Sequence, residues 1–282
     1  MTILFDGIAS GMLLFLISVG LSVTLGLMNF INLAHGAFAM LGGYVCVLLL
    51  NRLGMPFLAT LPLVVLVTAA AGVLLERTLY RRLYAASHLD QVLFSIALVF
   101  MSISAAQYLF GASQQPVALP GFLSGQVHLG GIDLGIYRLF LIAAGLAVAL
   151  LLHWLTAATR FGAHLRAAVD NRQVAAALGV NTERIFVLTF ALGTGLAGLG
   201  GALGIDTLGL DPSFAVKYIV YFLIVIAVGG AGSIKGSLLA ALLIGVVDVA
   251  GKYYVPEIGS FLIYTVMVAM LIVRPQGLFG TR

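Results

Sequence analysis

Ionisable residues that could do chemistry are few and scattered in this chain. The five histidines, which show no paired spacing of the kind that metal ligands have, are His35, His88, His128, His153 and His164. No G-x-x-x-x-G-K-[ST] phosphate loop is present, which argues against ATP hydrolysis by this chain itself. Nor does any nucleophile lie in a recognisable pattern with a base. We therefore predict that the chain is not an enzyme, and we expect neither a metal nor another cofactor.

Asp248 is the only acid well inside an apolar run. An ionised side chain at the centre of a bilayer costs about 2.5–3.5 kcal/mol. Lys252 follows four residues later, in the acid-then-base order that favours a pair on one helix face. We interpret Asp248 as a near-surface member of that pair. The alternative is a proton carrier.

Further polar residues interrupt the membrane pattern after the first apolar run. Asn29, Asn32, Gly36 and Gly43 would fall on one helical stripe, with His35 beside it. Polar groups at membrane depth are costly unless they face protein or a water-filled path. In one interpretation Asn32 caps the next helix and Asn29 bonds a loop carbonyl. In the other, the stripe borders a translocation path built from broken helices.

A glycine-rich run, VGGAGSIKG at residues 228–236, separates two short apolar runs. It predicts an internal turn. Exposed backbone at membrane depth must be buried in protein or line a cavity. Gly230 and Gly232 are therefore further candidates for the translocation path.

Residues 160–184, RFGAHLRAAVDNRQVAAALGVNTER, form a polar segment between two long apolar runs, with four arginines against two acids. Asn171 is placed to cap a short helix, and Gly179 is placed to end it. Asn181, with Glu183 in the first turn, is placed to open the next helix. A small capped basic helix that projects from a membrane bundle suits the docking of a cytoplasmic partner.

The elements that must position these residues are apolar runs. The 282 residues are 62% hydrophobic and only 9% charged, whereas a soluble domain carries about a quarter charged residues. Runs of spanning length cover residues 8–27, 57–75, 92–110, 139–158 and 185–204. Shorter runs cover residues 35–50, 218–228, 237–249 and 261–273. We predict an all-α, polytopic transmembrane bundle of about eight or nine segments, some short or broken, in a single permease domain over 1–282.

The basic residues predict the orientation, because Lys and Arg are in excess in cytoplasmic loops. They gather in residues 76–91, in the segment 159–184 and in the C-terminal tail, whereas residues 111–136 contain no Lys or Arg. We therefore place the C-terminus in the cytoplasm and 111–136 outside. Gly130 and Gly131 separate two short alternating runs in that outer loop, which predicts a β-hairpin. The net charge of +4 reflects the cytoplasmic loops and does not indicate nucleic-acid binding.

Four ordered motifs on this hydropathy profile carry a family resemblance over essentially the full length. They are GLMNFINLAHGAFAMLGGY at 26–44, the segment from residue 160, GGAGSIKGSLLAALLIG at 229–245 and RPQGLFG at 274–280. Together they resemble the inner-membrane permeases of branched-chain amino-acid ABC importers, the LivH type. Two departures are Ala37, where the family often has an acid, and Lys235 within the glycine-rich turn.

The resemblance implies a multi-pass subunit of the bacterial inner membrane. Its implied partners are a second homologous permease, two cytoplasmic ATPases and a periplasmic substrate-binding protein. The residues on which the family's coupling role would fall are Gly162, Arg166, Ala167, Asp170, Ala175, Ala176 and Gly179. Two alternatives stay open: a same-family permease for urea or short amides, and an ion-coupled secondary transporter in which Asp248 or His35 carries the ion.

Overall fold

The structure is a computed structural model that describes residues 2–28, 30, 32–84, 86–117, 119–129 and 132–280. Its helices are α1 (Thr2–Met28), α2 (His35–Asn51), α3 (Phe57–Leu75), the π-helical turn η1 (Glu76–Tyr80), α4 (Arg81–Leu83), α5 (His88–Phe110), α6 (Ile136–Ala158), α7 (Arg160–Asp170), α8 (Arg172–Ala177), α9 (Thr182–Leu208), α10 (Phe214–Gly229), α11 (Ile234–Tyr254) and α12 (Gly259–Val273). Two strands, β1 (Gln126–Leu129) and β2 (Ile132–Gly135), pair antiparallel.

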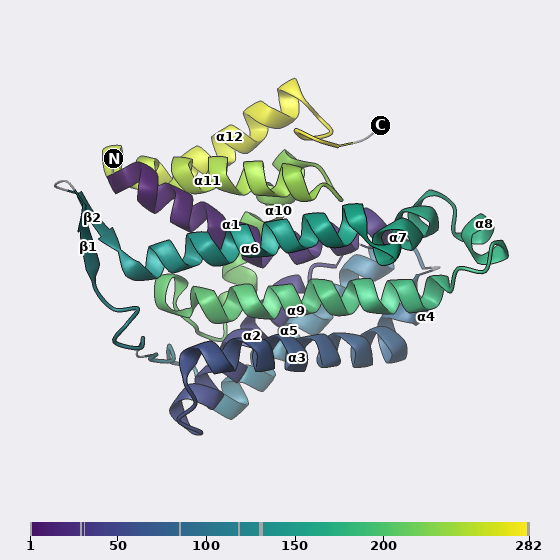
Figure 1. The fold of residues 1–282 in the computed structure, drawn as a ribbon, viewed down its shortest axis with the longest axis horizontal. Coiled ribbons are helices and arrows are strands. Elements are labelled where there is room, and N and C mark those ends of the chain that lie inside the picture. The colour runs from purple at the N-terminus through teal and green to yellow at the C-terminus, as the bar shows by residue number, and fades with distance from the viewer. Residues whose placement is uncertain are drawn as a thin grey trace.

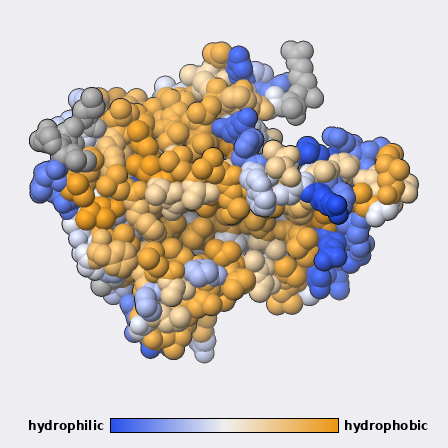
Figure 2. All heavy atoms as spheres, viewed as in Figure 1, coloured by the Kyte–Doolittle hydropathy of each residue, from blue (hydrophilic) through white to orange (hydrophobic). Residues whose placement is uncertain are grey.

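Within the described residues, six helices are long and apolar enough to cross a membrane, and three shorter apolar helices accompany them. The predicted all-α bundle and its eight or nine segments are therefore confirmed. Figure 1 shows most of the long helices lying along the long axis of the molecule. Apolar residues cover much of the visible surface, and polar residues gather toward the end that carries α7 (Figure 2).

The two ends of the bundle differ, and we name them by what they carry. The hairpin end holds β1 and β2, the start of α1 and the start of α6 (Figure 1). An ion pair between Asp6 and Arg138 joins α1 to α6 there. The loop end holds α4, α7, α8 and the start of α9. The predicted β-hairpin is confirmed, and its turn residues Gly130 and Gly131 lie outside the described residues.

Glycines set how closely the central helices pack. A Cβ added to Gly42 of α2 would lie 2.3 Å from the Cα of Gly198 in α9. A Cβ on Gly20 of α1 would lie 2.2 Å from the carbonyl oxygen of Gly193, also in α9. Small residues at such contacts let backbones approach in lipid, where helix association depends on close packing. Helix α9 thus packs directly against both α1 and α2, the two helices that flank the interruption at residues 29–34.

Most helices extend beyond their apolar runs, and two elements extend the furthest. The third helix was expected to end at residue 75, but it continues through η1 and α4 to Leu83, with the Thr78 hydroxyl donating to the Leu74 carbonyl at 2.7 Å. The run at 237–249 was expected to be short, but α11 covers Ile234–Tyr254. The Ser233 hydroxyl caps its start by accepting the Gly236 N–H at 3.0 Å. Both extensions include charged residues, which hydrophobic run length does not register.

Candidate functional site

The chain between α1 and α2 leaves helical geometry inside the bundle. Asn32 is buried there, and its Oδ1 accepts the N–H of Ala34 at 3.1 Å and the hydroxyl of Tyr80 at 2.9 Å. Phe30 packs edge-on against the Tyr80 ring. Because Tyr80 lies on η1, these contacts join the helix break to the segment that leads into the loop end. We call residues 29–35 the α1–α2 break.

The predicted helical stripe does not form, because helical geometry is interrupted between Met28 and His35. Asn32 bonds backbone just ahead of α2, and the cap position itself is Ala34, without a side-chain cap. Asn29 lies outside the described residues. The interruption that the polar residues predicted is therefore present, but these residues do not share one helical face.

His35 and Gly36 fix the start of α2 between two other helices. The Nε2 of His35 lies 2.8 Å from the carbonyl oxygen of Ile17 in α1, so this nitrogen carries a proton and donates it. The ring meets Phe222 of α10 edge-on. A Cβ on Gly36 would lie 2.7 Å from the carbonyl oxygen of Ala215, so α10 approaches the α2 backbone closely. The polar side chains of Asn32 and His35 are thus engaged by neighbouring helices.

Removing the Tyr80 hydroxyl tests this junction. Tyr80→Phe is expected to lower the free energy of unfolding by about 1 kcal/mol, because one buried hydrogen bond is lost. Asn32 keeps its bond to Ala34, so no buried group is stranded without a partner. Thermal unfolding in detergent measures the effect, with Tyr108→Phe as the matched control because Tyr108 is 90% exposed. Equal melting temperatures for the two variants would show that the Tyr80–Asn32 bond contributes nothing.

At the loop end, α7 packs against the last turn of α6. Gly162 is buried there, and a Cβ on it would lie 2.1 Å from the carbonyl oxygen of Thr156. The Arg166 guanidinium donates to that same carbonyl. On its other side Leu165 packs in a small apolar cluster with Phe186 of α9. Helix α7 is therefore held between α6 and α9.

Helix α8 has the start that the sequence predicts. The Oδ1 of Asn171 accepts the N–H groups of Gln173 at 3.1 Å and Val174 at 3.0 Å. The Oδ1 of Asn181 accepts the N–H of Arg184 at 2.9 Å and so caps α9 in the same way. Both predicted caps are confirmed, because an N-cap depends only on a short side chain and the backbone within its reach.

The end of α8 is a left-handed glycine cap. Gly179 has φ +88°, and its N–H donates to the Ala176 carbonyl at 3.0 Å. The N–H of Val180 donates to the Ala175 carbonyl at 3.0 Å, which completes a Schellman motif. The predicted end of the helix is confirmed.

Helix α8 protrudes from the bundle (Figure 1). Leu178, just past its end, is 80% exposed and Val174 is 54% exposed. Of the residues to which the resemblance assigns coupling, Arg166, Ala167, Asp170, Ala176 and Gly179 are exposed, whereas Gly162 and Ala175 are buried. Helix α8 and the residue after it thus expose apolar side chains at the loop end.

The glycine-rich turn between α10 and α11 lies beside α7. Gly230 and Gly232 both have positive φ, and a Cβ on Gly230 would lie 2.4 Å from the backbone nitrogen of Gly280. The C-terminal tail therefore packs directly on this turn. Gly232 lines a cavity of about 320 Å³ together with Gly162 and Arg166. The structure thus places Gly232 with the predicted coupling residues, whereas Asn32 and His35 lie at the α1–α2 break.

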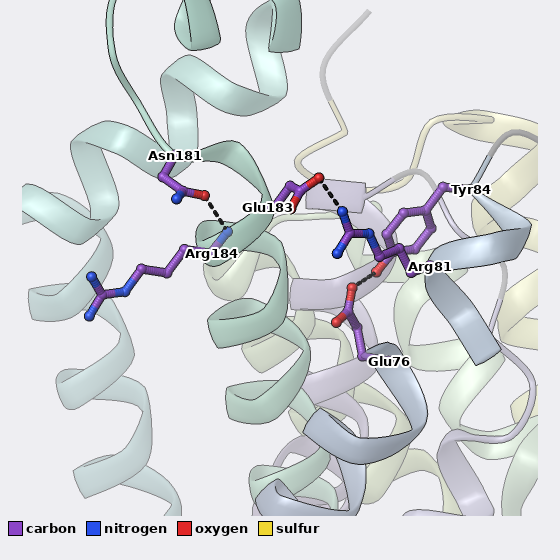
Figure 3. A network of polar contacts seen from close by, with 6 residues as sticks. All are labelled: Glu76, Arg81, Tyr84, Asn181, Glu183 and Arg184. Carbon is purple, nitrogen blue, oxygen red and sulfur yellow. Dashed lines mark hydrogen bonds and ion pairs between the residues drawn. The ribbon is translucent and has the colours of Figure 1, made fainter. Parts of the chain in front are cut away.

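A polar network between the η1–α4 segment and the start of α9 was not predicted (Figure 3). Glu76 is buried and accepts the Tyr84 hydroxyl at 2.8 Å, while its second carboxylate oxygen has no partner among the described residues. Burial, together with the bond to Glu76, raises the pKa of Tyr84. Arg81 forms an ion pair with Glu183, which joins α4 to α9. Buried positions on α3 recur every four residues up to Gly72, and Glu76 is the next position in this series. This spacing is the sequence feature that could have predicted the burial of Glu76.

Residues 3–271 match the family described as branched-chain amino acid transport system / permease component. The chain belongs to this family. The match covers the α1–α2 break, α7, α8 and the glycine-rich turn together. The resemblance to LivH-type permeases is therefore confirmed, and the protein is a multi-pass membrane permease of the ABC importer class.

Two relatives match this permease almost from end to end. The high-affinity branched-chain amino acid transport system permease protein BraD of Pseudomonas aeruginosa is 26% identical over 290 residues, covering 98% of this chain and 94% of BraD. The corresponding protein LivH of Salmonella typhimurium is 27% identical over 297 residues, with the same coverage of 98% and 94%. Both relatives are named as permease proteins of transport systems.

A solved structure has a similar fold. PsaBC from Streptococcus pneumoniae, in complex with Fab, aligns with a TM-score of 0.52, covering 97% of this permease and 91% of that chain. The sequences are 13% identical, so the likeness concerns the fold alone.

Asp248 lies on α11 of the permease and is buried except for about 7% of its surface. Its Oδ2 lies 2.7 Å from the Lys252 Nζ, and its Oδ1 has no partner among the described residues. The predicted acid–base pair is therefore present. Lys252 is 51% exposed, which places the pair at the edge of the bundle.

Asp248→Asn is expected to reduce uptake by less than about threefold, because a pair with one solvated partner contributes little energy. Radiolabelled substrate uptake in cells measures this, with Lys252→Gln as the control that removes the other charge. Complete loss of transport in Asp248→Asn alone, with normal assembly, would instead support ion coupling.

Proposed function

We propose that this chain is the translocation subunit of an importer for branched-chain or related hydrophobic amino acids, driven by ATP that separate subunits hydrolyse. The observation that carries the proposal is α8, a capped helix whose apolar side chains project from the loop end of a family member. Its docking into an ATPase would transmit ATPase closure to the bundle as a rigid-body movement. We treat the whole chain as one permease domain.

The proposed orientation places the loop end in the cytoplasm. Arginines and lysines concentrate there, on η1, α4, α7, α8 and the first turns of α9 and α11, as cytoplasmic loops require. The hairpin end would then face the periplasm, where a substrate-binding protein delivers the ligand. The C-terminal tail packs on the glycine-rich turn at the loop end. The proposed orientation therefore places the C-terminus on the cytoplasmic side of the bacterial inner membrane.

In this proposal the predicted residues have two roles. The coupling role falls on Gly162, Arg166, Ala167, Asp170, Ala175, Ala176 and Gly179. Buried Gly162 and Ala175 support the docking element from within, and the exposed members contact the ATPase. The candidates for the translocation path are Asn29, Asn32, His35, Gly36, Gly230 and Gly232. A broken helix supplies such a path with polar groups that a continuous apolar helix lacks.

The alternatives are a same-family permease for urea or short amides and an ion-coupled secondary transporter. Asp248 pairs with the half-exposed Lys252 at the edge of the bundle, which favours the ATP-driven proposal over ion coupling. Tagging this chain, solubilising its native membrane and identifying the co-purified proteins by mass spectrometry tests the proposal. A second permease and two ATPases are expected. Recovery of this chain alone would count against it.

A further inference from the structure

A hollow of about 760 Å³ lies at the loop end, between α4 and the start of α9. Four arginines from separate segments line it: Arg77 of η1, Arg81 of α4, Arg172 of α8 and Arg184 of α9. Figure 3 shows Arg81 and Tyr84 beside the start of α9, where Glu183 points toward Arg81 and the Arg184 side chain extends from the other side of the helix. We call this hollow the arginine groove.

The arginine groove carries excess positive charge. Two acids also line it, but Glu183 pairs with Arg81, and Glu76 accepts the hydroxyl of Tyr84. Among the described residues, no carboxylate lies within 4.0 Å of the other three arginines. One of them, Arg172, lies over the Phe186 ring at 4.9 Å. Three of the arginines that line the hollow therefore have no acidic partner among the described residues.

The same groove has an apolar side. Phe186, Val187 and Leu188 follow Arg184 within about one turn of α9 and also line the hollow. The span that ends in α4 is 27 residues long, which at 1.5 Å per residue is about 40 Å. A bilayer's hydrocarbon core is about 30 Å thick, so the end of this span reaches the headgroup region. The arginine groove therefore lies where polar headgroups meet acyl chains.

We propose that the arginine groove binds an anionic phospholipid. Guanidinium groups bind phosphate oxygens through paired, charge-assisted hydrogen bonds, and basic pockets between membrane helices bind lipid headgroups. The phosphate would contact Arg77 and Arg184, and an acyl chain would lie along Val187 and Leu188. A bound lipid would join η1 to the start of α9 beside α8. An acidic segment of a soluble partner would match the arginines but not this apolar side.

Native mass spectrometry of the purified full chain, titrated with phosphatidylglycerol, tests the proposal. Arg77→Gln with Arg184→Gln is expected to weaken phosphatidylglycerol binding about tenfold, because two charge-assisted contacts are lost. The matched control is Arg82→Gln with Arg160→Gln, which removes two exposed arginines of the same end that do not line the groove. The control should bind phosphatidylglycerol like the unmodified chain, and phosphatidylcholine should bind the unmodified chain weakly.

Three results would overturn the proposal. Equal phosphatidylglycerol binding by the two double variants would show that the groove is not the site. Inorganic phosphate that competes as well as phosphatidylglycerol would point to a soluble phosphate compound. Loss of co-purified protein from the groove variant, with its lipid binding unchanged, would make the groove a protein-docking surface.

Discussion

Gly179→Pro is expected to abolish ATP-driven uptake while the permease remains folded in the membrane. Gly179 has φ +88°, which proline cannot adopt, and its N–H, which proline lacks, donates to the Ala176 carbonyl. A proline that is incompatible with the local backbone costs about 3 kcal/mol, enough to disorder a six-residue helix. The bundle should be unaffected, because a Cβ at Gly179 would contact nothing within 4 Å.

Gly54→Pro is the matched control for this variant. Gly54 also has positive φ, at +61°, and its N–H donates to the Leu50 carbonyl at 3.1 Å after α2, at the opposite end of the molecule. Gly54→Pro should therefore disrupt the backbone in a similar way to Gly179→Pro, but at a site far from α8. Co-purified ATPase and uptake are measured for both variants. If Gly179→Pro retains normal uptake, or if both variants lose ATPase equally, the coupling role of α8 is wrong.

Gly201→Ala is expected to destabilise the whole bundle. The added Cβ would lie 1.9 Å from the carbonyl oxygen of Ala39, so the backbones of α9 and α2 would have to separate. Overpacking of this kind costs about 1–3 kcal/mol, and more where backbone must move. Alanine has a higher helix propensity than glycine, by about 1 kcal/mol. A lower stability of Gly201→Ala would therefore be caused by the steric clash and not by helix propensity.

Gly204→Ala on the same helix provides the comparison. Its Cβ would meet the flexible end of Leu208 at 3.3 Å and other atoms no closer than 3.6 Å. We expect this variant to unfold at or slightly above the temperature of the unmodified permease, and Gly201→Ala well below it. If both variants melted together, the close approach of α2 and α9 would not limit stability.

The sequence predicts the local features of this permease well. Asn171, Asn181 and Gly179 were each identified from the chain alone, and each forms the predicted cap. Caps depend on residues a few positions apart, so short-range pattern is sufficient. The number of membrane segments was also predictable, because hydropathy reflects the apolar surroundings of each helix.

Long-range contacts were not predictable in the same way. Nothing local in the chain indicates that Arg81 pairs with Glu183 or that Tyr80 donates to Asn32, because each pair is brought together by packing of distant helices. The packing of the C-terminal tail on Gly230 depends on tertiary structure in the same way. The stripe through Asn32 and Gly36 failed for a related reason, since helical periodicity was assumed across a break.

Transport by the reconstituted complex distinguishes ATP-driven import from ion-coupled transport. The complex that co-purifies with this chain is placed in liposomes with the substrate-binding protein, and accumulation of radiolabelled leucine is measured with and without ATP. We expect accumulation that requires ATP and persists when proton and sodium gradients are collapsed. Accumulation by this chain alone, driven by an ion gradient and indifferent to ATP, would contradict it.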